Sequence, residues 1–313
     1  MVIYIISDGK RGHLSQTRGL AEALLTRARE KRPEAQHSCH EISISGMSWL
    51  AKFRYKGKDL NLPEPNLILC AGHSTHLAAL SLARHKRCLC MVCMRPSLPT
   101  RFFDLCIMPR HDVPEGGVPG SRVFLTNGAI NCIKPRPDVE KRETLVLIGG
   151  PSKEFKWEAE HVLNQLTTIA RKSTRNIILT TSRRTPADFV QDVTSACPNI
   201  RVEPVDQTGP TWVADHLATA AEVWVTQDSV SMVYEALSSG SPVGIIEMLR
   251  KGDPHKDKPS RVLRGLNMLV ADGAACTFTE WAKTGTIPCP ETVLDEAGRA
   301  ADYILTTYPT LLS

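Results

Sequence analysis

Short apolar runs that alternate with helix-like stretches constrain the fold of this chain more than any other feature. The runs are Val2–Ile6, Leu67–Cys70, Leu89–Met94, Leu105–Met108, Val123–Leu125, Leu145–Ile148, Ile177–Leu179, Val223–Val225 and Val243–Ile246. Between two of them, apolar residues spaced by three and four positions from Ala159 to Ala170 mark one buried helix face. Alternating strands and helices predict parallel sheets with right-handed crossovers. Because the runs are almost continuously apolar, both faces of each sheet are expected to be covered.

The arrangement of these runs predicts two domains. The chain has 313 residues, about twice the length of a typical domain, and a polar, proline-rich segment at residues 131–143 separates two groups of strands. We predict two doubly wound, Rossmann-like α/β domains over residues 1–137 and 143–313. The last helix is expected either in the second domain or packed back on the first. Such sheets bind ligands beyond the carboxyl ends of their strands, so we expect the two edges to face a central cleft.

Composition and charge narrow the classes of partner. The net charge of +5 is spread along the chain, which is too weak for nucleic acid and suits an anionic ligand. The first strand follows Met1 directly, and no apolar run approaches the roughly 20 residues of a membrane span. We therefore expect a cytoplasmic protein. A peripheral contact of Arg27–Arg32 and Lys52–Lys58 with the inner membrane is one option, although solvated surface charges are the more frequent case.

The cysteines and histidines do not predict a metal site. Cys88 and Cys90 are expected on one face of a strand and Cys93 on the other, so the three cannot converge. His37-Ser38-Cys39-His40 is too compact for a usual zinc spacing, and Asp253 and Asp257 lie too far apart for an Asp-x-Asp motif. We expect buried thiols and no metal.

The helix expected after Val223–Val225 carries the first candidate site. Asp228 or Ser229 is placed to cap this helix, and the N–H groups of a helix N-terminus suit a diphosphate. Ser231 and Glu235 are four residues apart and share one helix face, so Glu235 is a candidate acceptor for ribose hydroxyls. From spacing alone, a helix cap followed by a solvated glutamate is an equally good interpretation.

Two further strand ends in the second half are candidate phosphate-binding turns. Gly149 and Gly150 end a buried strand and permit close backbone approach, with the Ser152 hydroxyl nearby, although a simple turn is the more frequent explanation. The other turn is Thr181-Ser182-Arg183-Arg184-Thr185-Pro186. Its paired arginines can grip phosphate oxygens, and its Thr-Pro step is typical of a helix start.

The first half offers matching loops. The first strand leads into Ser7-Asp8-Gly9-Lys10-Arg11-Gly12-His13-Leu14-Ser15-Gln16. His13 is a candidate general base, although local hydrogen bonding at a helix start is the more frequent role. A second loop, residues 71–76, brings His73 and Ser74 to the same expected edge, and spacing does not separate His73 from His13. The glycine spacing departs from the dinucleotide fingerprint, so NAD is not expected.

Four of these segments, in this order, resemble one family. They are Ser7–His13 with Gln16, Ile148–Lys153, Thr181–Pro186 and Val225–Met232. The family is the mitochondrial-fission family named for the plant elongated-mitochondria protein, and it has many bacterial members. The likeness runs from about residue 3 to about residue 250 of this sequence. The fold of this family resembles that of the GT-B glycosyltransferases.

The resemblance implies roles for particular residues. Glu235 would bind ribose, and the residues that contact diphosphate or sugar would include Thr226, Asp228, Ser229, Ser231 and Met232. The turns at Gly149, Gly150, Ser152, Thr181, Ser182, Arg183 and Arg184 would also hold the nucleotide-sugar. Gly12–His13 resembles the glycine–histidine loop of the enzyme that adds N-acetylglucosamine to a lipid-linked peptidoglycan precursor. It implies His13 and Asp8 as catalytic residues, with Gly12, Gln16, His73 and Ser74 on the acceptor side.

The implied function is a metal-independent transfer of a sugar from a nucleotide-sugar to an envelope glycan or glycolipid. The nucleotide-sugar is a substrate, so no cofactor is expected. Because fold likeness does not fix function, two alternatives stay open. One is a nucleotide-sugar epimerase of the same fold, and the other is a non-catalytic scaffold related to the mitochondrial fission proteins.

Overall fold

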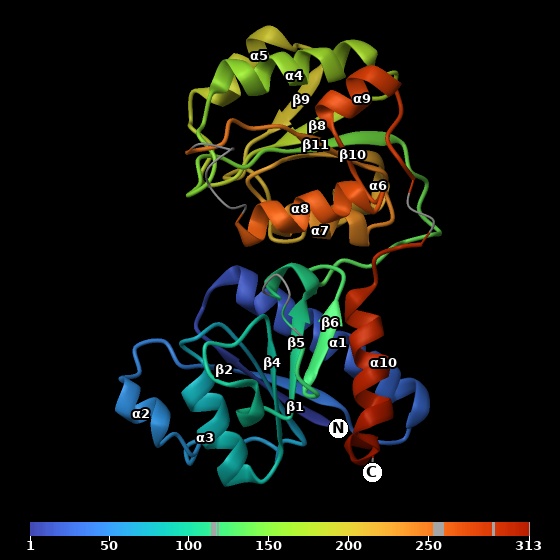
Figure 1. Ribbon diagram of the computed structural model, residues 1–313. Helices are drawn as coiled ribbons and strands as arrows, with labels where there is room; N and C mark the ends of the chain where they lie inside the picture. Colours follow the sequence, from blue (N-terminus) through green and yellow to red (C-terminus); the bar gives the residue numbers. More distant parts are fainter. Residues whose placement is uncertain (114–116, 118, 253–259, 290–291, 313) are drawn as a thin grey trace. The chain divides into compact units, whose positions relative to one another are not determined.

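The computed structural model describes residues 1–113, 117, 119–252, 260–289 and 292–312. The chain divides into two compact units, one made of Met1–Cys132 with Asp295–Ser313 and the other of Ile133–Leu294. Each unit contains a six-stranded sheet in which every pair of neighbouring strands is parallel (Figure 1). The predicted pair of Rossmann-like α/β sheets is therefore confirmed.

The sheet of the first unit has the order β2-β1-β3-β4-β5-β6. Its strands are β1 (Val2–Ser7), β2 (Ser38–Ser43), β3 (Leu67–Ala71), β4 (Leu89–Cys93), β5 (Leu105–Pro109) and β6 (Val123–Thr126). Its α-helices are α1 (Arg11–Lys31), α2 (Trp49–Phe53), α3 (His76–Lys86) and α10 (Glu296–Thr307), with short 3-10 turns η1 (Thr100–Phe102), η2 (Arg110–Asp112) and η3 (Pro309–Leu312).

Alternating side chains of β1 build the two cores of this unit. Ile3 and Ile5 pack with α1 and α10 on one face of the sheet, and Tyr4 and Ile6 pack with α3 on the other. The same alternation sends Cys93 to the first core and Cys90, with Cys88 at its edge, to the second. Both faces of the sheet are thus covered, as the apolar runs predict.

Helix α10 brings the end of the chain back to the first unit. Ala300, Ala301 and Ile304 are fully buried in the cluster that contains Leu24 and Ala28 of α1. The small side chains of α10 and α1 allow the two helices to approach closely. The boundary lies at Cys132/Ile133, inside the proline-rich segment expected as the linker, and residues 295–313 belong to the first unit.

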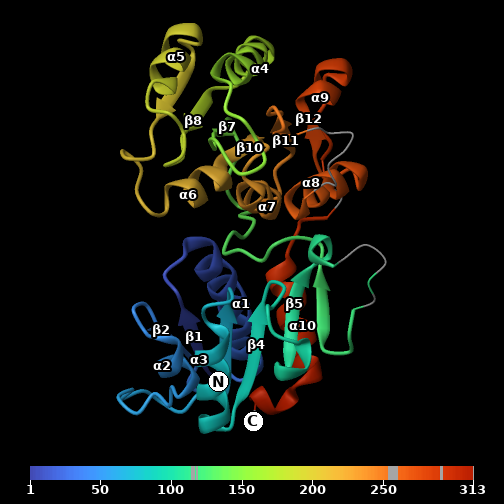
Figure 2. The same ribbon diagram turned by 60° about the vertical axis from the view of Figure 1, so that its left-hand side comes forward.

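The sheet of the second unit has the order β12-β11-β10-β7-β8-β9. Its strands are β7 (Glu143–Leu147), β8 (Ile177–Thr180), β9 (Ile200–Glu203), β10 (Ala220–Thr226), β11 (Val243–Ile246) and β12 (Cys276–Thr277). Its helices are α4 (Ala159–Lys172), α5 (Phe189–Ala196), α6 (Trp212–Thr219), α7 (Val230–Ser238), α8 (Arg261–Ala271) and α9 (Phe278–Thr284). Helices α4, α5 and α9 pack over Trp224 on one face, and Figure 2 shows α7 and α8 on the other side of the strands.

Each sheet reverses its strand order at one position. In the first sheet β2 lies on one side of β1, and the chain then returns to add β3 on the other side of β1. In the second sheet β8 and β9 lie on one side of β7, and the chain returns to add β10 on its other side. The loops after these strands diverge at such a switch point and leave a crevice at the carboxyl edge of the sheet.

One local expectation about a helix start differs from the structure. The expected start of a helix at Thr185–Pro186 is wrong, because α5 begins at Phe189 with Asp188 as its N-cap. The Thr185 hydroxyl instead donates to the carbonyl of Gly149, which holds the turn against β7. Within the described residues, no helix is both long enough and apolar enough to cross a bilayer.

Candidate functional site

The switch point of the first unit brings together Asp8, His13 and Ser74. Asp8 follows β1, His13 lies in the first turn of α1, and Ser74 follows β3. Both carboxylate oxygens of Asp8 lie 3.1 Å from His13 Nδ1, and the Ser74 hydroxyl donates to Asp8 Oδ2 over 2.7 Å. The Asp8 side chain is 8% exposed and that of His13 is 21% exposed. A buried carboxylate thus orients an imidazole whose other nitrogen is available to a ligand.

Gly72 provides the space for the His13 ring. The φ angle of Gly72 is +84°, in the left-handed region, and a Cβ built on this residue would lie 2.2 Å from His13 Cε1. Any side chain at this position would therefore be strained and would displace the imidazole. Gly72 was not predicted as a site residue, although the Gly-His-Ser order directly after the buried strand β3 is a signal that could have identified it.

The charge of Asp8 is fixed by its partners. Burial alone would raise the pKa of Asp8, but hydrogen bonds from Ser74, His13 and the Lys10 N–H hold it below the usual carboxyl value. The Lys10 ammonium lies 3.8 Å from Asp8 Oδ2. Asp8 therefore remains ionised near neutral pH and can stabilise a proton taken up by His13.

The other residues expected on the acceptor side lie at the start of α1 and in the loop after β3. Gly12 lies beside His13 in the first turn of α1, which has no side-chain cap, and Gln16 is half-buried one turn further on. His73 is exposed, whereas His76 is buried. Burial lowers the pKa of His76 to about 4, with smaller contributions from His73 and His13. The structure therefore distinguishes His13, which has a carboxylate partner, from His73.

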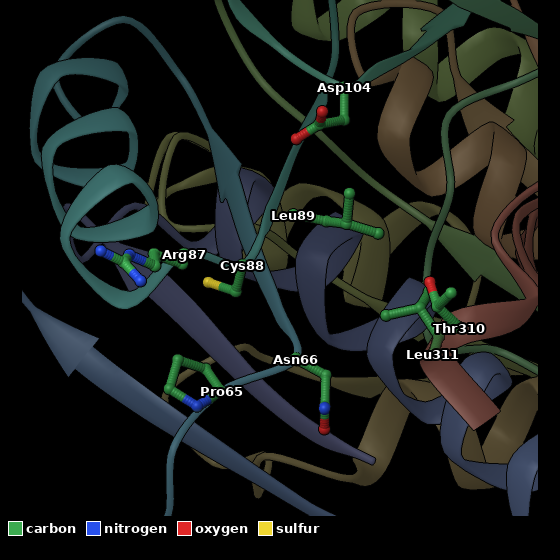
Figure 3. A pocket seen from close by; sticks show the side chains of 8 residues that line it. All are labelled: Pro65, Asn66, Arg87, Cys88, Leu89, Asp104, Thr310 and Leu311. Carbon is green, nitrogen blue, oxygen red and sulfur yellow. The ribbon is translucent and has the colours of Figure 1, made fainter. Parts of the chain in front are cut away.

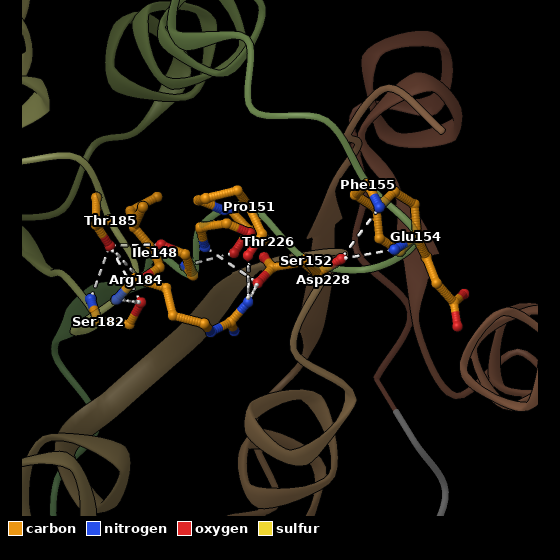
Figure 4. Close-up of polar contacts among 12 residues, drawn as sticks. Ile148, Pro151, Ser152, Glu154, Phe155, Ser182, Arg184, Thr185, Thr226 and Asp228 are labelled. Carbon is orange, nitrogen blue, oxygen red and sulfur yellow. Dashed lines mark hydrogen bonds and ion pairs between the residues drawn. The ribbon is translucent and has the colours of Figure 1, made fainter. Parts of the chain in front are cut away.

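The switch point of the second unit is held together by Asp228 (Figure 4). Its carboxylate accepts a hydrogen bond from the Gly150 N–H over 3.0 Å and pairs with the Arg184 guanidinium over 2.7 Å. A Cβ on Gly149 would lie 2.2 Å from the Asp228 carboxylate. The fully buried Asp228 side chain thus ties together the turns after β7, β8 and β10.

The hydroxyls of four further predicted residues accept backbone hydrogen bonds within these turns or next to them. The buried Thr226 hydroxyl accepts from the Gly149 N–H over 2.6 Å, and the buried Thr181 hydroxyl accepts from Val205. Ser152 closes its own turn, since its hydroxyl accepts from the N–H groups of residues 154 and 155 (Figure 4). Ser182 accepts from the Arg184 N–H in the same way. These hydroxyls shape the loops.

Helix α7 begins without a side-chain cap. The expectation that Asp228 or Ser229 caps it is wrong: Ser229 is the N-cap residue, but its side chain makes no capping bond, and Asp228 is drawn away to Gly150 and Arg184. No acidic side chain lies in the first turn, which includes Ser231 and Met232. The first N–H groups and the positive end of the helix dipole therefore have no side-chain cap, and they suit an anion.

Glu235 lies one turn into α7. Burial raises the pKa of Glu235 to about 7, although a hydrogen bond from Ser231 opposes the shift. The Ser231 hydroxyl donates to Glu235 Oε1 over 3.4 Å. A half-buried carboxylate with one weak donor can accept further hydroxyl donors from a ligand. In the turn after β8, Arg183 is exposed, whereas the Arg184 guanidinium is already occupied by Asp228 and two backbone carbonyls.

The described residues contain no cluster of three metal-ligating side chains, and the Asp253–Asp257 segment lies outside the described residues. A cavity of about 350 Å³ lies among Pro65, Asn66 and Leu89 at the opposite edge of the first sheet, where the strands begin (Figure 3). Ligand sites in doubly wound sheets lie at the carboxyl edge, so this cavity is separate from the candidate site.

Comparisons with known proteins agree with this architecture. The family model described as mitochondrial fission ELM1 matches residues 11–308. An uncharacterised protein of Rickettsia prowazekii is 26% identical over 302 residues, covering 78% of this chain and 83% of that protein.

Two solved structures illustrate the fold. UDP-GlcNAc 2-epimerase from Neisseria meningitidis, solved with UDP-GlcNAc, has a TM-score of 0.57 at 11% identity and covers 99% of both chains. The E. coli heptosyltransferase WaaC, solved with ADP-2-deoxy-2-fluoro heptose, has a TM-score of 0.50 at 11% identity, covering 91% of this chain and 100% of that one. At such identities the likeness shows the fold alone, which is that of the GT-B glycosyltransferases and related epimerases.

Proposed function

Because the chain belongs to the mitochondrial fission ELM1 family and has a GT-B fold, we propose that it is a nucleotide-sugar-dependent glycosyltransferase. The second unit holds the donor, and the first unit supplies the group that activates the acceptor. The acceptor class is a glycan or glycolipid of the cell envelope. No metal ion or cofactor takes part in the proposed transfer.

The observation that carries this proposal is the Asp8–His13 pair at the switch point of the first sheet. The buried Asp8 carboxylate orients the His13 imidazole, and Gly72 leaves the space that the ring occupies, which is the arrangement expected of a positioned general base. In the proposed reaction, His13 takes the proton of an acceptor hydroxyl, whose oxygen forms a bond to the anomeric carbon. The bond from that carbon to the diphosphate breaks, and the diphosphate leaves with the electron pair.

The second unit would stabilise the departing diphosphate. The uncapped first turn of α7 provides N–H donors, and Arg183 is an exposed cation in the turn after β8. Glu235 would accept the ribose hydroxyls one turn along the helix. Arg184 acts indirectly, since it holds the carboxylate of Asp228 and through it the glycine turn.

A second candidate is nucleotide-sugar epimerisation, which the match to the Neisseria meningitidis epimerase favours. The two reactions differ in their need for an acceptor. Incubation of the chain with a nucleotide-sugar alone would yield an epimer in one case and no new sugar in the other. Product analysis by NMR decides between them.

The proposed function is tested by thermal shift with UDP, GDP, CMP and ADP and their sugars, because ligands of the folded state raise its stability. We expect one base to give a clear shift that Glu235→Ala weakens. His13→Asn should retain that shift and lose transfer by about 10²–10⁴-fold. Absence of any shift would contradict nucleotide-sugar binding, and full transfer by His13→Asn would contradict the catalytic role alone.

A further inference from the structure

Helix α2 exposes three large apolar side chains. Trp49 is 65% exposed, Leu50 52% and Phe53 59%, and α2 has no buried residue. Figures 1 and 2 both show α2 at the outer edge of the first unit, beside α3. An exposed apolar cluster of this kind marks an interaction surface more often than isolated surface residues do.

The direction of these side chains follows from their spacing. Positions 49, 50 and 53 of a helix fall within an arc of roughly 100°, so the three side chains share one face. Residues on either side of the helix attach the segment to the unit, because Met47 and Tyr55 pack against the core that faces α3. The Ser48 hydroxyl caps the helix by accepting from the Ala51 N–H. The segment is thus anchored with its apolar face outward.

The same segment is strongly basic. Lys52, Arg54, Lys56 and Lys58 lie within it, and residues 42–58 include no aspartate or glutamate. Within the described part of the chain, no ion pair neutralises any of these four side chains. On the helix, positions 52 and 54 flank the apolar arc, one on each side. Apolar rings bordered by lysine and arginine are the composition of helices that lie in a membrane interface.

We propose that the α2 patch, made of Trp49, Leu50 and Phe53 with Lys52, Arg54, Lys56 and Lys58, docks the protein on an anionic lipid surface. The positive charge of the patch favours an anionic lipid surface over a second copy of the chain. Self-association through this face would bring two groups of four cations together, whereas anionic headgroups complement them. The aromatic and leucine side chains would enter the boundary between headgroups and acyl chains. This inference does not depend on the proposed glycosyl transfer.

The test is co-sedimentation of the full chain with vesicles of phosphatidylethanolamine and phosphatidylglycerol, compared with phosphatidylcholine alone. We expect binding to the anionic vesicles only, weakened by salt. Phe53→Ser should weaken it about ten-fold or more, and Lys52→Gln with Lys56→Gln about twenty-fold. Leu249→Ser, which changes an exposed leucine of the second unit, and Arg171→Gln with Lys283→Gln, which remove two exposed cations of that unit, should leave binding unchanged.

Tryptophan fluorescence gives a second measurement that needs no destabilising variant. Trp49 in the interface should shift the emission to the blue when anionic vesicles are added, and Trp49→Phe should abolish that shift while retaining most of the binding. Equal binding of Phe53→Ser and the unchanged chain would overturn the proposal. So would the absence of vesicle binding together with a dimer, seen by analytical ultracentrifugation, that Phe53→Ser dissociates.

Discussion

Gly72 is the residue on which the orientation of His13 depends most directly. We expect Gly72→Ala to cost about 1–2 kcal/mol for an L-residue in the left-handed region and also to move the imidazole, since its Cβ would lie 2.2 Å from the ring. Gly273→Ala is the matched control, because Gly273 has a φ of +67° and no atom within 4 Å of its added Cβ. Denaturant unfolding of both variants measures the backbone strain that alanine introduces at a left-handed position. Histidine NMR spectra should change at His13 in Gly72→Ala alone, and an unchanged His13 signal would contradict the steric role.

Glu235 makes the stability of the protein depend on pH. Burial raises its pKa from 4.5 to about 7, so the folded state binds the proton more tightly than the unfolded chain does. The contribution of this carboxyl to stability therefore falls as pH rises from about 4.5 to about 7. At pH 8 we expect Glu235→Gln to raise the free energy of unfolding by up to about 3 kcal/mol.

At pH 4.5 the same variant should differ little from the unchanged chain. Urea unfolding at both pH values measures the effect. Glu160→Gln, on the exposed face of α4, should be neutral at either pH. Equal effects of Glu235→Gln at the two pH values would show that the titration of Glu235 is not the cause.

Several candidate residues could be proposed from sequence because they follow strands directly. The pairing of Asp8 with Ser74 could not, since 66 positions separate them and only the placement of β1 beside β3 brings their loops together. The capping role expected of Asp228 failed for a related reason. A local rule takes no account of Arg184 and Gly150, which reach Asp228 from other strands.

Among the secondary-structure elements, the turns after β7, β8 and β10 depend on one ion pair. Removal of Arg184 leaves the fully buried Asp228 carboxylate with a single backbone donor, which is costly. Because the Arg184 side chain is 44% exposed, we expect Arg184→Ala to cost about 1–3 kcal/mol. Arg183→Ala, one residue away and exposed, should cost less than about 0.5 kcal/mol. Denaturant unfolding compares them, and equal costs would contradict the bracing role.

Helix α3 begins with a histidine that burial holds neutral. The pKa of His76 is lowered from 6.5 to about 4, so the unfolded chain binds the proton more tightly, and stability falls as pH drops from about 6.5 to about 4. Between these pH values we expect the free energy of unfolding of His76→Leu to fall by up to about 3 kcal/mol less than that of the unchanged chain. His85→Leu, on the exposed side of the same helix, should not. Parallel slopes of unfolding free energy against pH for all three proteins would contradict this assignment.

The strands that sequence patterns missed share one property. β2 has one buried residue, β9 is exposed or half-buried over most of its length, and β12 has only two residues. β2, β9 and β12 lie at sheet edges. An edge strand faces water on its outer side and can be short or polar, so in β2, β9 and β12 the continuous apolar run that identifies a central strand is absent.

At the scale of the whole molecule, the last helix determines how the two units unfold. Ile304 of α10 is fully buried against α1, so Ile304→Asp should destabilise the first unit by more than about 3 kcal/mol. Amide protection should be lost in β1 and β3 and retained in β7 and β10. Thr306→Asp, on the exposed side of α10, is the control. Equal loss of protection in both units would show that they unfold together.

The return of the chain to its first unit also has a consequence for biosynthesis. Residues 133–294 are consecutive, so the second unit is complete before α10 has been synthesised. About 175 residues separate Cys132 from the end of α10, and at 5–20 residues per second the ribosome needs roughly 10–35 s to add them. During that interval the apolar face of α1 awaits its cover and is a natural target for nascent-chain chaperones. The second unit, though later in the sequence, is therefore expected to mature first.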